Sequence, residues 1–295
     1  GLVSFALGSD TAGSGRVPAA FNNLVGLKPT RGWLSTRGLV PACRSLDCVS
    51  VFALNVDDAE AVTMIASGFD AEDPYSRVAP SLPTQLHGMR LGVPARPEWF
   101  GDARAAAAWL RACAELEALG ANLVPLDYGV LHEVAALLYD GPWVAERYVA
   151  TAGFLDTHAD AMNPIVRSII EQGRSLSAAA VFRAEYQLRA LRRRAEQLIG
   201  SVDALLVPST PTFPTVAEIN ADPVRLNSRL GHYTNFVNLL DWSALALPAG
   251  FRDDGLPFGI TLVGSTWQDR ALAGFGRRWL QHLLKEPPSI TAPAP

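Results

Sequence analysis

Three consecutive stretches between residues 89 and 128 place the strongest constraint on the fold of this chain. "MRLGVP" (89–94) predicts a short strand, "DARAAAAWLRACAELEALGA" (102–121) an amphipathic helix that ends at Gly120, and "NLVPLDY" (122–128) a second strand. A strand, a helix and a strand of these lengths are typical of a βαβ unit. The segment therefore predicts an α/β protein.

Further apolar stretches continue the pattern along the chain. Residues 2–7 predict a buried strand, which leads into a loop of small residues at 8–16. The other predicted elements are an apolar stretch at 23–30 that ends at Pro29, a long helical section at about 129–200, apolar strands within 203–215, 243–250 and 258–264, and an amphipathic helix at 269–285.

The stretch 45–68 predicts a strand or loop followed by a helix. Asp57 or Asp58 is the expected N-cap of that helix, and Gly68 is expected to end it. Apolar strands that alternate with helices indicate a mixed and mostly buried sheet. We therefore predict an α/β fold around such a sheet.

Composition limits the classes of partner. The net charge of −4 disfavours a nucleic-acid groove or an anionic membrane surface as the main partner. The arginine-rich run at 185–200 is interpreted as a solvated helix face rather than a nucleic-acid site. No apolar run reaches the roughly 18 residues that a membrane span needs.

The chain has three cysteines, Cys43, Cys48 and Cys113. A low and odd count is typical of a reducing compartment, so we expect a cytoplasmic protein. Cys43 and Cys48 are interpreted as small buried side chains rather than metal ligands, because no histidine or second cysteine pair lies nearby in the sequence. No metal site is predicted.

The two ends of the sequence indicate a piece of a longer protein. The chain opens without an initiator methionine inside an apolar run, and it ends in the proline-rich "EPPSITAPAP". We expect residues 1–286 to form a domain that lacks its N-terminal part, and 287–295 to be a tail or linker.

The loop "GSDTAGSGRVPAAFNN" (8–23) places Ser14 after the small residues Ala12 and Gly13. Such residues let the backbone approach a substrate closely, and consecutive N–H groups can hold an oxyanion beside a nucleophilic serine. An ordinary tight turn or a Gly/Ser phosphate loop is the competing interpretation. The P-loop pattern does not fit, because no lysine follows in the required place. The residues alone leave nucleophile and turn both open.

The run "GSDTAGSGRVPAAFNNLVGLKPTRG" resembles the nucleophile segment of the amidase signature family over about twenty positions. The resemblance implies the amidase-signature fold, a mixed central sheet with helices on both faces. It implies Ser14 as the acyl-enzyme nucleophile and the backbone N–H groups of Thr11, Ala12, Gly13 and Ser14 as the oxyanion hole. Asp10 and Arg16 correspond to positions that brace the loop.

Members of that family use a Ser–cis-Ser–Lys triad, and its lysine and bridging serine precede the nucleophile. The lysines of this chain are Lys28 and Lys285, and neither corresponds to the catalytic one. The resemblance therefore implies that this chain carries the nucleophile without its base. It implies no metal or organic cofactor.

Two further stretches resemble the allophanate hydrolases of that family. These are residues 30–59 and "LLYDGPWVAERY" (137–148), in which Tyr139 and Arg147 match residues that contact allophanate. Their spacing predicts positions about two turns apart near one face of one helix, bracketing a small molecule without touching each other. An arginine fork suits a carboxylate, and a tyrosine hydroxyl suits the ureido end. An ion pair of Arg147 with Glu146 or Asp140, and a core role for Tyr139, are the competing interpretations.

The resemblance implies an amidohydrolase that converts allophanate to ammonia and carbon dioxide, and a homodimer for the full-length protein. The stretch 230–251 is expected to line the far wall of the site, with His232 and Tyr233 as weaker candidates for substrate contact. Alternatives are an amidase with another substrate, one component of an amidotransferase that acts on charged tRNA, and a non-catalytic fragment.

Overall fold

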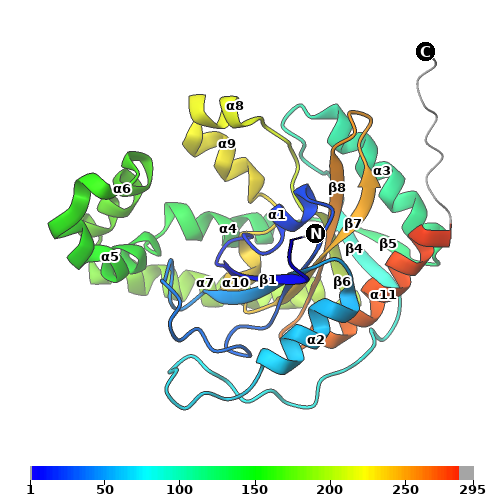
Figure 1. Ribbon diagram of the computed structural model, residues 1–295, viewed down its shortest axis with the longest axis horizontal. Coiled ribbons are helices and arrows are strands. Elements are labelled where there is room, and N and C mark those ends of the chain that lie inside the picture. Colours follow the sequence, from blue (N-terminus) through cyan, green and yellow to red (C-terminus); the bar gives the residue numbers. More distant parts are fainter. Residues whose placement is uncertain (1, 286–295) are drawn as a thin grey trace.

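The computed structural model describes residues 2–285, which fold around one eight-stranded mixed sheet (Figure 1). The strand order is β1-β3-β2-β7-β8-β6-β4-β5. β4 runs parallel to both of its neighbours, and the other neighbouring strands are antiparallel. The strands are β1 (Phe5–Asp10), β2 (Val25–Lys28), β3 (Cys48–Ala53), β4 (Arg90–Pro94), β5 (Asn122–Leu126), β6 (Ala204–Pro208), β7 (Ser243–Phe251) and β8 (Pro257–Gly264).

Helices connect and cover the strands. They are α1 (Val17–Phe21), α2 (Val56–Ala66), α3 (Ala103–Ala118), α4 (Gly129–Asp140), α5 (Val144–His158), α6 (Pro164–Glu171), α7 (Ala178–Ile199), α8 (Val216–Ala221), α9 (Pro223–Leu230), α10 (Phe236–Leu239) and α11 (Asp269–Lys285), with short 3₁₀ helices at Ala159–Ala161 and Gln172–Ser175.

The central strands bury both of their faces, and each face belongs to a separate core. On β6, Leu206 faces the core formed with α2, α3 and α11, whereas Leu205 and Val207 face the core formed with α4, α7 and α10. Successive side chains of a strand point to opposite faces, so continuously apolar strands are what such a two-sided arrangement requires. The predicted fold, a mixed sheet with helices on both faces, is confirmed.

The βαβ unit predicted from residues 89–128 is present as β4, α3 and β5. Arg90 pairs with Asn122 and Pro94 with Leu126 in parallel register. Asp102 begins α3 by accepting a hydrogen bond from the N–H of Ala105 at 2.9 Å, and Gly120 follows the helix with a φ of 95°. The glycine fits because this left-handed backbone conformation is costly for other residues.

The prediction of a buried strand at 2–7 is wrong. β1 lies at the edge of the sheet, pairs only with β3 in the described part of the chain, and leaves Phe5 and Leu7 about half exposed, at 46% and 53%. An apolar run does not reveal whether a strand has one neighbour or two. Only the end of β1, at Asp10, is buried.

The long helical section predicted at 129–200 is divided into α4, α5, α6 and α7. Its first break lies at Gly141 and Pro142: a Cβ on Gly141 would lie 2.2 Å from the carbonyl oxygen of Leu137, and proline cannot continue the hydrogen bonding of α4. α5 and α6 project away from the sheet (Figure 1). The arginine-rich stretch lies on α7, where Arg189, Arg193 and Arg194 are exposed, as predicted.

Cys43 and Cys48 are both buried and free, which confirms their interpretation as small buried side chains. Between residues 2 and 285, no helix combines the length and the apolar character needed to cross a membrane. The predicted tail at 287–295 lies outside the described residues, and the cytoplasmic location stays a prediction.

The N-cap of α2 is Asn55 rather than Asp57 or Asp58. The Asn55 side chain accepts a hydrogen bond from the N–H of Asp58 at 2.8 Å, and its backbone is extended as an N-cap requires. Asp57 lies in the first turn, where its charge favours the positive end of the helix dipole.

We expect Asn55→Ala to lower the free energy of unfolding by about 1 kcal/mol, because the substitution removes the capping acceptor. Asp57→Ala should cost less, since an exposed charge near a helix end contributes about 0.3–1 kcal/mol. Urea unfolding followed by tryptophan fluorescence measures both. Because Asp57 also pairs with Arg277, its loss is measured in an Arg277→Ala background as well, and a loss that still exceeds that of Asn55→Ala there would contradict the assignment of the cap.

Candidate active site

The serine loop begins where β1 ends, and the carboxylate of Asp10 organises it. Asp10 is fully buried and accepts hydrogen bonds from the N–H groups of Gly13 (2.8 Å) and Gly15 (2.9 Å). Its two oxygens also accept from Nε (2.9 Å) and Nη2 (3.0 Å) of the buried Arg16. One side chain thus fixes the backbone on both sides of Ser14, as a bracing residue would.

The charge of Asp10 is stabilised despite its burial. Burial alone would raise the pKa of this carboxyl group, but the charge and hydrogen bonds of Arg16, the nearby charge of Lys28 and the Gly15 N–H lower it below the ordinary value. Asp10 is therefore an ionised anchor.

The turn itself presents Ser14 outward. Gly13 has a φ of 141°, and its carbonyl oxygen accepts from the N–H groups of Arg16 and Val17, both at 2.9 Å, at the start of α1. The Ser14 side chain is exposed. Because C=O and N–H point in opposite directions across a trans peptide, the N–H of Ser14 faces away from α1.

The four N–H groups of the expected oxyanion hole are not equivalent in this structure. The N–H of Gly13 is donated to Asp10, whereas those of Thr11, Ala12 and Ser14 have no hydrogen-bond partner among residues 2–285. The Thr11 hydroxyl donates to Asp47 through a short contact. The N–H groups without a partner therefore include those on either side of Gly13.

A segment after β2 connects the serine loop to α5. Asp47, which holds Thr11, also accepts from the N–H groups of Ala42 (2.9 Å) and Cys43 (3.2 Å). Two residues earlier in the chain, Ser45 donates its N–H and hydroxyl to Glu146 at 2.6 and 2.7 Å. The start of α5 is thereby held beside the loop.

Tyr139 and Arg147 lie on two helices, not on one. Tyr139 is near the end of α4 and Arg147 in the first turns of α5, with the break at Gly141 between them. The prediction of a single continuous helix is wrong, because its glycine and proline end α4.

The two side chains nevertheless lie near enough to each other to interact electrostatically. Partial burial raises the pKa of Tyr139, the charge of the Arg147 guanidinium opposes that rise, and the charges of Cys43 and Asp10 add to it. No hydrogen bond joins the two side chains among residues 2–285, and their predicted separation without direct contact stays a prediction. Tyr139 is 44% exposed, so the core interpretation does not describe it. The charges that act on Tyr139 include those of Arg147 and of Asp10 in the serine loop, so the side chain lies near both.

Arg147 also lies beside the thiol of Cys43. Burial raises the pKa of that thiol to about 11, with the Arg147 charge acting in the opposite direction. The ion pair of Arg147 with Glu146 or Asp140, the competing interpretation, is not formed in the described part of the chain, where Glu146 accepts hydrogen bonds from Ser45. The guanidinium is left without a carboxylate partner there.

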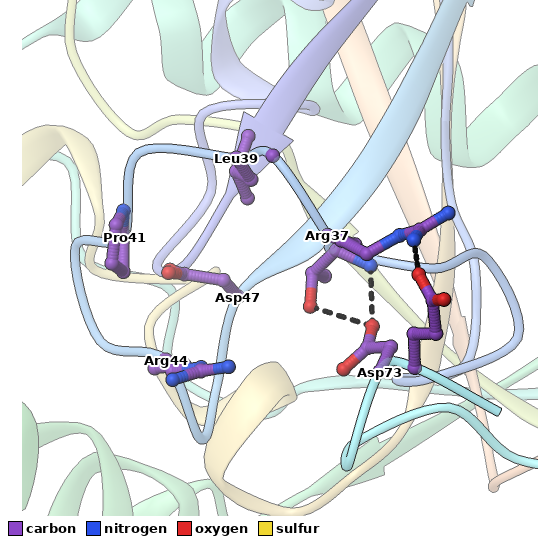
Figure 2. Close-up of a pocket in the computed structure, with 9 residues that line it drawn as sticks. Arg37, Leu39, Pro41, Arg44, Asp47 and Asp73 are labelled. Atoms are coloured by element: carbon purple, nitrogen blue, oxygen red, sulfur yellow. Dashed lines mark hydrogen bonds and ion pairs between the residues drawn. The ribbon is translucent and has the colours of Figure 1, made fainter. Parts of the chain in front are cut away.

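A polar cavity of about 220 Å³ lies beside this framework (Figure 2). Asp73 on one wall accepts from the N–H (2.6 Å) and hydroxyl (3.0 Å) of Thr36, and Asp47 reaches it from the serine-loop side. Its lining does not include Ser14, Tyr139 or Arg147. The full lining is Thr36, Arg37, Gly38, Leu39, Pro41, Arg44, Asp47, Glu72 and Asp73.

Tyr233 packs inside the fold, whereas His232 is partly exposed and lines a surface cavity with Phe100 and Arg229. The hydroxyl of Tyr233, a residue 1% exposed, accepts from the N–H of Glu98 at 2.7 Å. The His232 ring packs on His132 of α4 with centroids 4.4 Å apart, and the Nε2 atoms of both are buried without a hydrogen-bond partner. They connect the 230–240 segment to α4.

Sequence reasoning missed the residues that hold the loop from behind, Thr234 and Asn238. Both are fully buried and both donate to the loop backbone. A signal was available, because their spacing of four in the apolar run "YTNFVNLL" places two polar side chains on one face of a turn. Buried polar side chains need partners, and the serine loop supplies them.

No group of three or more histidine, cysteine, aspartate or glutamate side chains that could hold a metal ion occurs among residues 2–285. The site therefore consists of a backbone turn with an exposed serine, a buried charged anchor, and an arginine beside a tyrosine. Such an arrangement suits attack on a carbonyl group whose developing negative charge is held by N–H groups.

Comparison with known proteins gives relatives over nearly the whole chain. The family model described as Amidase matches residues 1–273. The urea amidolyase of Lachancea kluyveri is 46% identical over 286 residues, which cover 95% of this chain and 16% of that protein. The 2-amino-5-chloromuconic acid deaminase of Comamonas testosteroni is 31% identical over 283 residues, covering 93% of this chain and 59% of that protein.

A solved structure, that of Kluyveromyces lactis allophanate hydrolase, superimposes with a TM-score of 0.92 at 45% identity. The match covers 95% of this chain and 47% of that one. The chain thus spans about half the length of that hydrolase and less than a fifth of the urea amidolyase.

We expect Asp10→Asn to lower the free energy of unfolding by roughly 3–5 kcal/mol, because it leaves the buried Arg16 charge unpaired. Glu133→Gln is the matched control, since it breaks the exposed ion pair between Glu133 and Arg194 and should cost under about 1 kcal/mol. Urea unfolding at pH 7 measures both. Equal losses would show that the buried pair does not anchor the loop.

The His132–His232 pair predicts a loss of stability in mild acid. Burial, then the adjacent His132, lower the pKa of His232 to about 4, with Glu98 acting in the opposite direction. Burial likewise lowers the pKa of His132, against Asp127. The unfolded chain therefore binds more protons between about pH 6.5 and 4, and stability falls as the pH falls through that window.

For His232 we expect a loss of about 1–2 kcal/mol between pH 7 and pH 5. His232→Phe, which keeps a ring against His132, should flatten the pH dependence of the free energy of unfolding. His158→Asn, at an exposed position, should leave it unchanged. Identical pH profiles for wild type and His232→Phe would refute this account.

Proposed function

The chain belongs to the amidase family, and we propose that it is the nucleophile-bearing part of an allophanate hydrolase. Such an enzyme hydrolyses the amide of allophanate, which is urea-1-carboxylate. The observation that carries the proposal is the pairing of an exposed serine on an amidase loop with an arginine that has no carboxylate partner in the described part of the chain. The 45% identity and TM-score of 0.92 to an allophanate hydrolase support the same substrate.

In this proposal Arg147 and Tyr139 orient the substrate. The planar guanidinium donates two parallel hydrogen bonds to the allophanate carboxylate. The Tyr139 hydroxyl, which is protonated at neutral pH like that of any tyrosine whose pKa is not lowered, exchanges hydrogen bonds with the ureido end. The short linkage between the serine loop and α5 through Asp47 and Ser45 supports a site small enough for this substrate.

The chemical steps follow from the loop. Ser14 Oγ attacks the terminal carbonyl carbon of allophanate, and the N–H groups beside Gly13 hold the oxyanion of the tetrahedral intermediate. Collapse of the intermediate breaks the C–N bond and releases ammonia. Water then attacks the acyl-enzyme and releases N-carboxycarbamate, which decarboxylates without help. The net products are ammonia and carbon dioxide.

Serine is a weak nucleophile without a base, and neither lysine forms a hydrogen bond with Ser14 among residues 2–285. Lys28 is fully buried, where its Nζ donates to the carbonyl of Pro29 at 2.7 Å and lies 3.5 Å from Cys48 Sγ. Lys285 is exposed at the end of α11, the helix that packs in the core with α2 and α3. We therefore propose that the lysine and bridging serine come from a preceding segment, and that these 295 residues alone do not hydrolyse allophanate.

Ammonia release from allophanate tests this proposal. We expect none from this chain alone, and turnover from an upstream-extended protein, meaning this chain preceded by a segment with the family's lysine and bridging serine. Ser14→Ala in the extended protein should reduce kcat by at least about 10⁴-fold, because it removes the nucleophile. Ser4→Ala, at an exposed serine outside the loop, is the control. Turnover that survives Ser14→Ala would contradict the proposal.

Substrate selectivity tests the role of Arg147. In the extended protein, Arg147→Leu should lower kcat/KM for allophanate by roughly 10²-fold or more, because an ion-paired fork worth about 3 kcal/mol is lost. The ratio of allophanate to biuret, in which an amide replaces the carboxylate, should fall by a similar factor. Arg104→Leu, in an exposed ion pair on α3, should change neither value. An extended protein that ignores allophanate but hydrolyses other amides would leave the family intact and the substrate wrong.

A further inference from the structure

The segment that holds the serine loop from behind makes four hydrogen bonds with it, all of them partly or fully buried. Thr234 Oγ1 donates to the carbonyl oxygen of Ala12 at 2.7 Å. Asn238 Nδ2 donates to the carbonyl oxygen of Asp10 at 2.7 Å, and Asn238 Oδ1 accepts from Arg16 Nη2 at 3.1 Å. Arg16 Nη1 in turn donates to the carbonyl of Thr234 at 3.1 Å. The loop is bonded to this segment at both of its ends.

These contacts fix the orientation of two consecutive peptide groups. Thr234 holds the Ala12 carbonyl on one side, and Asp10 holds the Gly13 N–H on the other, as a planar trans peptide requires. The next peptide has its carbonyl turned toward α1, so the N–H of Ser14 faces the exposed side. Rotation of the first peptide would carry the second with it.

Packing allows little rotation. A Cβ on Gly13 would lie 2.2 Å from Thr234 Oγ1, so only glycine fits against this threonine, and its φ of 141° is one that other residues rarely adopt. Thr234 and Asn238 are both 0% exposed. The donor side chains are therefore held inside the fold, where a hydrogen bond orients its partner more strongly than it does in water.

We propose that Thr234 and Asn238 are positioning residues for the reaction at Ser14: they hold the loop so that its N–H groups point at the oxyanion. This inference rests on the proposed function of Ser14. Neither side chain touches the substrate, which in that proposal is bound by α4 and α5. Loss of the Thr234 hydroxyl therefore lowers kcat and leaves KM nearly unchanged.

Thr234→Val in the upstream-extended protein tests the inference, because it removes the donor at nearly constant volume. We expect kcat for allophanate to fall about 10- to 100-fold, less than the 10²–10³-fold typical of losing an oxyanion donor itself, with KM within about twofold. Thr234→Ser, which keeps the hydroxyl, should restore kcat to within about threefold. The rate at which a fluorophosphonate labels Ser14 should fall in parallel, since that reaction needs the same N–H groups.

Thr63→Val is the matched control. Thr63 is also fully buried and donates to a backbone carbonyl, that of Ala59 at 2.8 Å, but it lies on α2 on the other side of the sheet. Thermal unfolding of each variant separates lost stability from lost positioning. Equal kcat in Thr234→Val and Thr63→Val, or a raised KM with unchanged kcat, would overturn the inference. Activity that survives Ser14→Ala would instead overturn the proposed function on which it rests.

Discussion

The ion pair between Asp10 and Arg16 is the interaction on which the site depends. A carboxylate and a guanidinium removed from water are costly unless their hydrogen-bonding groups are satisfied. Here Asp10 accepts from two backbone N–H groups as well as from Arg16, and Arg16 donates onward to Thr234 and Asn238. The pair thereby joins the end of β1 to α10, two parts of the chain that lie far apart in the sequence. A loop built from small residues has few side chains of its own to hold it, and this network takes their place.

The same network explains why the site is made largely of backbone. The groups that face the substrate side of the turn are peptide N–H groups, whose direction is set by where the neighbouring carbonyls are bonded. Dipoles fixed in advance need no reorganisation when charge develops on a carbonyl oxygen. In the proposed function, recognition of the substrate is separate, on α4 and α5, and these helices are connected to the loop through Asp47, Cys43 and Ser45. Substrate binding and the chemical step thus depend on different structural elements.

Much of the fold could be predicted from local patterns. The βαβ unit and the central strands follow from apolar periodicity, and the serine loop from its small residues. What failed depended on neighbours distant in the sequence. The exposed position of β1 depends on how many strands pair with it. The N-cap of α2 depends on which of three nearby polar side chains accepts a hydrogen bond from the first turn of the helix. The break after Tyr139 can be predicted from "GP", whereas the match of residues 137–148 to a single stretch suggests one helix.

The candidate site shows the same division. Ser14, Asp10 and Arg16 lie within one motif, whereas Thr234 and Asn238 belong to the site only because α10 packs behind the loop. The proximity of Tyr139 to Arg147 likewise results from the angle between two helices.

The central claim is that Ser14 carries the acyl group. Its most direct test is rapid quenching of the upstream-extended protein during turnover of allophanate, followed by mass spectrometry of its peptides. The account predicts an adduct on the peptide that contains Ser14, either N-carboxycarbamoyl or the carbamoyl group that remains once its carboxylate leaves as carbon dioxide, present during turnover and lost once substrate is exhausted. An adduct on another residue would contradict the account. Turnover without any adduct, under conditions in which the acyl-enzyme forms faster than it is hydrolysed, would also contradict it.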